Sequence, residues 1–179
     1  GLKLFAGDGG PATGANLSFP HGMVVDKDDN LIFSDKGHYR IRKITPEGII
    51  NTIGGNGSRG NVGNNIPALE ANFYNVTTLI QNSTGDTFML SPSGFVSLIR
   101  RLDQKGVIHD YLETADENYL EAISKSKYKG LVQTGAVATI TQFSDIVFDP
   151  KGNLFISDRL NHQIRTIDTK GNISTIAGT

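Results

Sequence analysis

The feature that most constrains the fold of this chain is an internal repeat. The segment Asn30-Leu-Ile-Phe-Ser-Asp35 returns 123 positions later as Asn153-Leu-Phe-Ile-Ser-Asp158. Ile41-Arg-Lys-Ile44 returns at the same offset as Ile164-Arg-Thr-Ile167, without an insertion or deletion between the two pairs. Self-similarity at a fixed period is typical of repeat architectures, in which each repeat is one structural unit.

A more divergent copy lies between these two. Pro67-Ala-Leu-Glu-Ala-Asn-Phe73 follows Pro11-Ala-Thr-Gly-Ala-Asn-Leu17 at an offset of 56, whereas Ile99-Arg-Arg-Leu102 follows its counterpart at an offset of 58. The change of offset indicates two extra residues near 91–97. We therefore expect one domain over 1–179, with residues 1–7 as the outer strand of a preceding unit and three units at about 7–55, 56–114 and 115–179.

Each unit holds four short segments rich in Val, Ile, Phe and Thr, separated by turn residues such as Pro46-Glu-Gly48. Gly and Asn at these turns supply the positive φ that tight hairpins need. Alternation within the segments, as in Arg40-Ile-Arg-Lys-Ile44, gives each strand one buried and one wetter face. Four antiparallel strands repeated in this way predict an all-β β-propeller, of which this chain carries three blades as an open arc.

The motif at the third unit supports a more specific resemblance. Asp158-Arg-Leu-Asn161-His162-Gln-Ile-Arg165 resembles the NHL-repeat family of β-propellers, and Gly7-Asp-Gly-Gly-Pro-Ala-Thr13 resembles the connector of its long-repeat subset. The first unit has His38-Tyr39 at the Asn-His position, and the second unit departs from the pattern around 91–94. The resemblance implies a propeller, but it does not define a function, because this fold supports many unrelated activities.

Composition excludes several functional classes. The chain has no Cys, which removes disulfides, thiolate nucleophiles and Cys-based zinc sites. Its formal net charge of −1 provides no overall basic field for nucleic acid, so we do not expect nucleic-acid binding. No apolar run reaches the roughly 20 residues of a membrane-spanning helix, and we expect no membrane partner.

Three motifs that could carry chemistry fail on inspection. Asp26-Lys-Asp28-Asp-Asn30 begins like a calcium loop, but Leu31 stands where Gly is required. Gly55-Asn-Gly57-Ser-Arg-Gly60 has dinucleotide-loop spacing without a following helix. Metal-ligand spacing is also absent among the four histidines, which are His21, His38, His109 and His162. We therefore predict no catalytic residue, no metal ligand and no cofactor.

Polar residues at equal blade positions have a structural interpretation. Asp35 and Asp158 are expected to accept backbone N–H bonds at the turn into the next strand. Asn161 and His162 are assigned to the same structural turn.

Glycosylation signals are more frequent than chance predicts. Chance gives about two Asn-x-Ser/Thr sites for this composition. The chain has five, at Asn16, Asn56, Asn75, Asn82 and Asn172. They favour an extracellular or secretory-pathway protein that carries glycans.

The combined prediction is a non-enzymatic binding or structural scaffold. An open arc leaves the flat faces of its end blades uncovered, so we expect self-association or additional propeller blades as partners. The segment 116–129 departs from the repeat and is either a surface excursion or a docking element.

Two alternatives remain open. Some six-bladed relatives are metal-assisted lyases or hydrolases, which would require convergence of His21, Asp26, Asp145 or Asp149 on the channel. Other relatives bind RNA, for which Arg42 and Arg165 would form part of a basic stripe.

Overall fold

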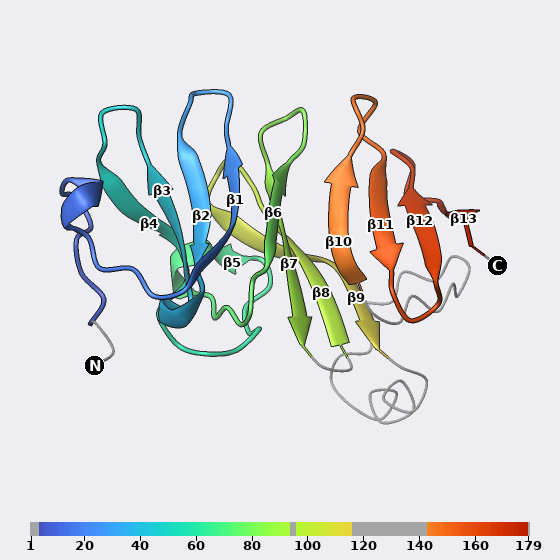
Figure 1. The fold of residues 1–179 in the computed structure, drawn as a ribbon, viewed down its shortest axis with the longest axis horizontal. Coiled ribbons are helices and arrows are strands. Elements are labelled where there is room, and N and C mark those ends of the chain that lie inside the picture. The colour runs from blue at the N-terminus through green and yellow to red at the C-terminus, as the bar shows by residue number, and fades with distance from the viewer. Residues whose placement is uncertain (1–3, 94–95, 116–142, 179) are drawn as a thin grey trace.

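The computed structural model describes residues 4–93, 96–115 and 143–178, and these form three antiparallel sheets arranged side by side (Figure 1). The first sheet has the order β1 (Pro20–Val25), β2 (Leu31–Asp35), β3 (Arg40–Ile44) and β4 (Ile50–Gly54). The third has the order β10 (Phe143–Phe148), β11 (Leu154–Asp158), β12 (Gln163–Ile167) and β13 (Ile173–Ala177). The prediction of three propeller blades in an open arc is confirmed.

The middle sheet is the divergent one, and it gains a fifth strand. Its order is β5-β9-β8-β7-β6, with bounds β5 (Ile66–Pro67), β6 (Thr78–Gln81), β7 (Thr87–Ser93), β8 (Val96–Leu102) and β9 (Val107–Ala115). The two-residue β5 belongs to the connector and pairs with β9. The described residues also contain three single-turn 3-10 helices, η1 (Ala12–Gly14), η2 (Lys36–His38) and η3 (Ala68–Glu70). The predicted excursion at 116–129 lies outside the described residues.

An aspartate or asparagine closes several of the strand-connecting turns through its side chain. Asp149 Oδ1 accepts the backbone N–H groups of Lys151 and Asn153 at 2.9 and 2.8 Å, while the Asn153 amide donates to Asp149 Oδ2 at 2.8 Å. Asp26 and Asp168 make the same bonds in their own turns. These local side-chain bonds satisfy turn N–H groups that the sheet ladder leaves without a partner, which explains the short loops.

The core lies between the sheets rather than within any one of them. One buried cluster joins the first two sheets and includes Ile41, Phe73 and Met89, which are 0–1% exposed. A second joins the middle and third sheets and includes Leu90 and Ile156. Each blade is therefore stabilised mainly by its neighbours, as expected for a repeat protein.

The strand registers of the first and third sheets match. Val24 pairs with Ile32 as Val147 pairs with Phe155, so residues 123 positions apart occupy equal places on equal faces. The first strands of the three sheets, β1, β6 and β10, lie next to one another, because β1 and β10 both contact β6. We call this edge of the arc the inner edge.

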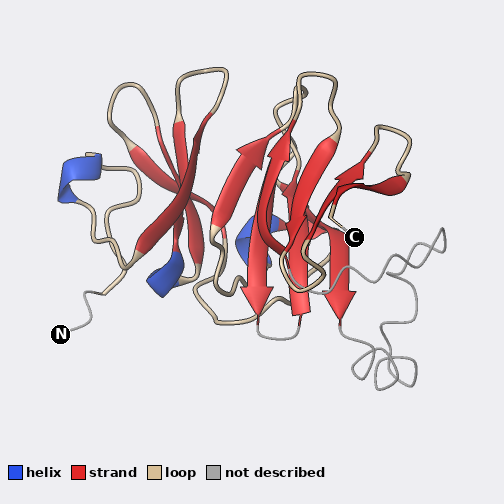
Figure 2. Ribbon diagram, turned by 45° about the vertical axis from the view of Figure 1, so that its right-hand side comes forward, coloured by secondary structure: helices blue, strands red, loops and turns tan. Residues whose placement is uncertain are grey.

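The two ends of the arc present sheet faces without a described blade against them (Figure 2). We call the outward face of the first sheet the head face; Met23 and Val25 lie on it and are 62% and 59% exposed. Its outer half is covered, since Phe33 and Arg42 are 4% and 0% exposed and Arg42 donates to Asp8 of the connector at 2.8 Å. The outward face of the third sheet, the tail face, carries Val147 and Ile176, which are 58% and 52% exposed.

Residues 4–6 belong to no named strand. Ala6 makes an isolated antiparallel bridge with Asn16, and the Asn16 amide donates to the Leu4 carbonyl at 2.9 Å. Over the described residues, the structure contains no helix with the length and apolarity required to cross a bilayer.

Candidate functional site at the inner edge of the arc

A row of polar groups crosses the three first strands where they begin. We call it the axial row, and it consists of His21, Thr77, Thr78 and Asp145. His21 Nδ1 lies 2.9 Å from the Thr77 carbonyl oxygen. The Thr78 hydroxyl donates to Asp145 Oδ1 at 3.2 Å. Three blades therefore contribute to one row of polar side chains and backbone groups.

The bonds of the axial row orient its two titratable groups. A carbonyl can only accept a hydrogen bond, so Nδ1 of His21 carries the proton and Nε2 of the neutral ring holds the lone pair. Asp145 Oδ1 accepts a second bond, from the Ile146 N–H at 3.0 Å. Both side chains are exposed. The row can thus offer a base or ligand nitrogen and an oriented carboxylate to a molecule at the inner edge.

The other two acids considered for a channel site lie elsewhere. Asp26 and Asp149 follow the far ends of β1 and β10 and belong to turns at the opposite rim. Burial tends to raise the pKa of Asp26, but its bonds to Asn30 and Asp28 lower the net value. Across the described parts of the chain, no three His, Asp or Glu side chains come together in a group that could hold a metal ion.

The predicted turn residue Asp35 sits in a buried ionic cluster. Asp35 Oδ1 accepts the Ser18 N–H at 2.7 Å, and Oδ2 lies 2.8 Å from His38 Nδ1 and 3.2 Å from Arg42 Nη1. Arg42 in turn donates to Asp8 Oδ1 at 2.8 Å. Asp35 and Arg42 side chains are fully buried, so the cluster ties the connector and the loop before β1 to the first sheet.

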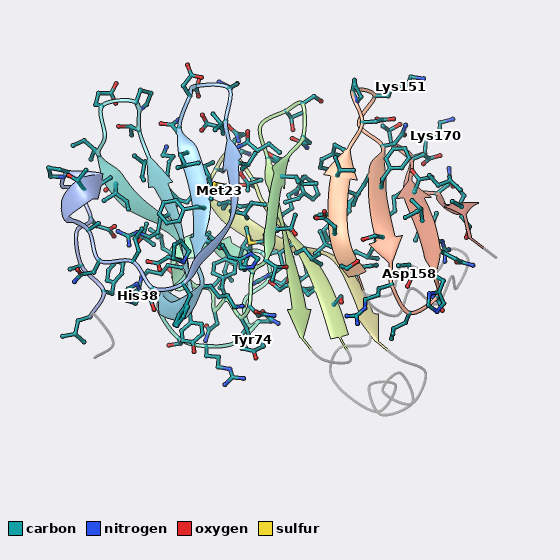
Figure 3. The ribbon with its side chains drawn as sticks, viewed as in Figure 1. Met23, His38, Tyr74, Lys151, Asp158 and Lys170 are labelled. Carbon is teal, nitrogen blue, oxygen red and sulfur yellow. The ribbon has the colours of Figure 1, made fainter. Side chains whose placement is uncertain are left out.

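The third blade repeats this arrangement in a looser form. The Asn161 amide donates to Asp158 Oδ2 at 2.9 Å, while Arg165 Nη1 stays 4.0 Å from the same oxygen. His162 and its counterpart Tyr39 both have φ of 55°, a left-handed turn geometry. Figure 3 shows His38 and Asp158 at the same rim, away from Lys151 and Lys170.

The middle blade uses a different acid at the equivalent arginine. Arg100 Nε donates to Asp110 at 2.9 Å, and Nη1 donates to the Asn72 carbonyl at 3.0 Å. Burial raises the pKa of Asp110 and lowers the pKa of Arg100, while their mutual attraction opposes both shifts. The arginines considered for an RNA-binding stripe, Arg42 and Arg165, are 0% and 6% exposed and occupy intramolecular positions.

The five glycosylation signals occupy different environments. Asn56 donates its amide to the Glu70 carbonyl, and Asn172 donates to Asp168. Asn75 has a positive φ of 51°, and the Asn16 amide is bonded as described above. Asn82 instead accepts bonds on its amide oxygen from the backbone of the β6–β7 turn and from the Thr84 hydroxyl at 2.8 Å.

Sequence reasoning did not identify Thr77 and Thr78 as neighbours of His21 and Asp145. A signal was available, because His21, Thr77 and Ser144 occupy equal blade positions at offsets of 56 and 123. The missing step was the geometry: His21 meets Thr77, and Thr78 meets Asp145, only when the first strands of successive blades adjoin.

Comparisons with known proteins place the fold. No protein-family model matches the chain, and no curated protein matches it. A solved streptogramin B lyase superposes with a TM-score of 0.54 and 16% identity over 97% of this chain and 42% of its own. A gluconolactonase from Xanthomonas campestris gives 0.58 and 11% over 92% and 48%. Virginiamycin B lyase from Staphylococcus aureus gives 0.52 and 16% over 90% and 42%.

The chain therefore spans less than half the length of these structures, and the likeness concerns the propeller fold. These neighbours are enzymes, which contradicts the prediction that this chain is not an enzyme. The sequence gives the residue types at each blade position, but it does not show which of them a propeller brings together at its inner edge. The chain carries the fold of a β-propeller segment whose solved neighbours include enzymes.

Proposed function

We propose that the chain is an assembly segment of a β-propeller, which packs its head and tail faces against further blades and so mediates protein–protein contact. One observation carries this proposal. Met23 on the head face is 62% exposed, whereas its counterparts Leu79 and Ile146, at internal blade interfaces, are each 3% exposed. The side chain at this blade position is thus buried wherever a neighbouring blade is present. Exposed apolar side chains on one face favour an interface there.

A covalent tandem of two copies tests this function. Gly178 corresponds to Gly55 and Gly7 to Gly63, and direct fusion leaves seven residues between the paired glycines, as in the single chain. If the end faces are blade interfaces, the tandem unfolds at least about 5 °C above the single chain and binds less apolar dye per residue. Equal melting temperatures and equal dye binding per residue would refute the proposal.

The repeat pattern and the sequons extend the proposal to family and location. The chain is a long-repeat NHL segment that passes through a secretory pathway and carries a glycan on Asn82, at the β6–β7 turn beside exposed Ser83 and Thr84. Expression through a eukaryotic secretory pathway should add glycan mass, which Asn82→Gln reduces by one glycan. An unmodified secreted protein would contradict this.

Catalysis at the axial row is a second candidate function. It is supported by the free Nε2 of oriented His21 and by the enzyme names of the solved neighbours. In lactone hydrolysis, Nε2 would take a proton from water as the water oxygen bonds to the carbonyl carbon; the ring C–O bond then breaks and its oxygen takes a proton. Release of acid from gluconolactone by the tandem protein, measured by titration, should fall about 100-fold in His21→Ala. His162→Asn is the control, and equal rates for both variants would exclude this role.

A further inference from the structure

The partner of the tail face can be identified from the interfaces inside the chain; this inference rests on the proposed assembly function. Because the first and third sheets share one register, the tail face carries the positions that the first sheet turns toward the middle sheet. Val147, Ile164 and Ile176 correspond to Val24, Ile41 and Ile53, which pack in the first core cluster. The tail face is thus a second copy of a face whose covering is known.

An open cavity of about 250 Å³ lies at one end of this face, beside the β11–β12 turn. Its lining includes Ser157, Ile164, Ala177 and Gly178, next to residues from the ends of β11 and β12. The equivalent positions of the first sheet, Ser34, Ile41, Gly54 and Gly55, are covered by residues of the middle blade and the connector before it.

The filling consists of one aromatic ring and a short backbone stretch. The Phe73 ring lies so close to Gly54 that an added Cβ there would come within 3.2 Å of it. The Ser34 hydroxyl donates to the Val76 carbonyl at 3.0 Å, and Gly55 N–H donates to the Ala68 carbonyl at 2.8 Å. This type of cavity is therefore filled by an apolar side chain, here that of Phe73, with the Ala68 and Val76 carbonyls on either side of it in the chain; we call such a side chain the knob.

This chain carries a second such knob near its start. Pro11-Ala-Thr-Gly-Ala-Asn-Leu17 corresponds residue by residue to Pro67-Ala-Leu-Glu-Ala-Asn-Phe73, and each contains a 3-10 turn, η1 and η3, at the same place. Both turns begin at a proline in extended geometry, with φ of −58° and −52°. Leu17 is half-buried and the counterpart of Phe73.

We propose that a second copy of this chain docks head to tail, with its Leu17 in the cavity of the tail face. The Ala12 carbonyl of the second copy takes the place of the Ala68 carbonyl opposite Gly178. In the proposed contact, exposed Ser144 takes the place that His21 has between the first two blades. The backbone carbonyl of the second copy's His21 then takes the place of the Thr77 carbonyl, which His21 contacts inside the chain. Polar groups and apolar groups are thus matched on both sides.

Two copies joined in this way carry six blades, twice the three sheets of one chain. A head-to-tail contact closes into a ring when the rotation per blade permits it, and the neighbouring structures are about twice as long as this chain. Closure would also bring the second axial row to the same inner edge, so the candidate site is completed only in the assembly.

Cysteine pairs test the direction of docking, because the chain has no cysteine of its own. Ala177 corresponds to Gly54, which lies against Phe73, so Ala177→Cys in one copy should meet Leu17→Cys in another. On oxidation, a mixture of the two single variants should give a covalent dimer at least tenfold faster than either variant alone. Ala177→Cys mixed with Leu69→Cys is the control, since Leu69 is 56% exposed on η3, away from the end faces.

Native mass measured by light scattering completes the test. The wild-type chain should reach twice its 19.3 kDa with rising concentration. Ile176→Asp should raise the dissociation constant at least about 30-fold, whereas Leu69→Asp should leave it unchanged. A monomer at all concentrations, or faster cross-linking within one variant than between the two, overturns the second-copy proposal. A stabilised tandem together with a monomeric single chain would overturn only this inference and leave the assembly function standing.

Discussion

Removal of the Arg42 guanidinium tests how the connector is held to the first blade. In Arg42→Ala, the buried Asp35 carboxylate loses a partner at 3.2 Å, and Asp8 loses one at 2.8 Å. Removing one partner of a buried ion pair costs roughly 3–5 kcal/mol, because the remaining charge stays buried. Asp35 keeps its bonds to Ser18 and His38, so we expect the lower end of this range, about 3 kcal/mol.

Urea unfolding followed by circular dichroism measures this loss. With a slope of about 2 kcal/mol per molar urea, the midpoint should fall by roughly 1.5 M. Arg165→Ala is the matched control, because it removes the same side chain from the same blade position. Its guanidinium lies 4.0 Å from Asp158, beyond hydrogen-bond distance, so we expect a smaller loss than in Arg42→Ala.

The stability losses of Arg42→Ala and Arg165→Ala distinguish two causes of the effect. If Arg165→Ala destabilises the chain as much as Arg42→Ala, side-chain packing rather than an uncompensated carboxylate explains the effect. The double variant with Asp35→Asn provides an independent check, since a neutral amide should recover part of the lost stability. Equal stability of the single and double variants would refute the proposed coupling.

Three further predictions concern packing, backbone geometry and pH. Phe73→Ala should destabilise the chain by about 3–5 kcal/mol in the same urea assay, because the ring is 1% exposed between two blades. Gly55→Ala should cost at least about 1 kcal/mol more than Gly48→Ala: both have positive φ, but only at Gly55 would a Cβ meet backbone atoms. The pKa of Asp103 is lowered by its hydrogen bond with His109 and by backbone N–H donors. Its folded pKa lies below the unfolded one, so its contribution is present above about pH 4 and is lost as pH falls through the folded value. The stability difference between wild type and Asp103→Asn should therefore shrink on acidification; a constant difference would contradict the role of the charge.

The blade architecture could be predicted because it is encoded locally. Each hairpin carries its own turn residues, such as Asp149 with Asn153, and each strand its own alternation. The repeat then supplied the number of blades. The fifth strand of the middle sheet escaped prediction because Ile66–Pro67 pairs with β9 only after the connector folds back.

The candidate site could not be predicted to the same extent. The sequence suggests His21 and Asp145 as two of four residues for a channel site, yet their relation depends on Thr77 and Thr78, which the middle blade places between them. Nothing in the local sequence around His21 states that a carbonyl 56 positions away will orient its ring. The same limit explains the prediction that the chain is not an enzyme.

The sequence by itself determined the all-β class, the repeat and the turn chemistry, since these depend on residues close together in the chain. Only the tertiary structure decided which copies of each repeated position are covered. Leu79 and Ile146 are buried because a preceding blade packs against them, whereas Met23 occupies the same position on an open face. Burial in a stacked repeat is a property of neighbouring units, and identical sequence patterns therefore become core in one blade and surface in another.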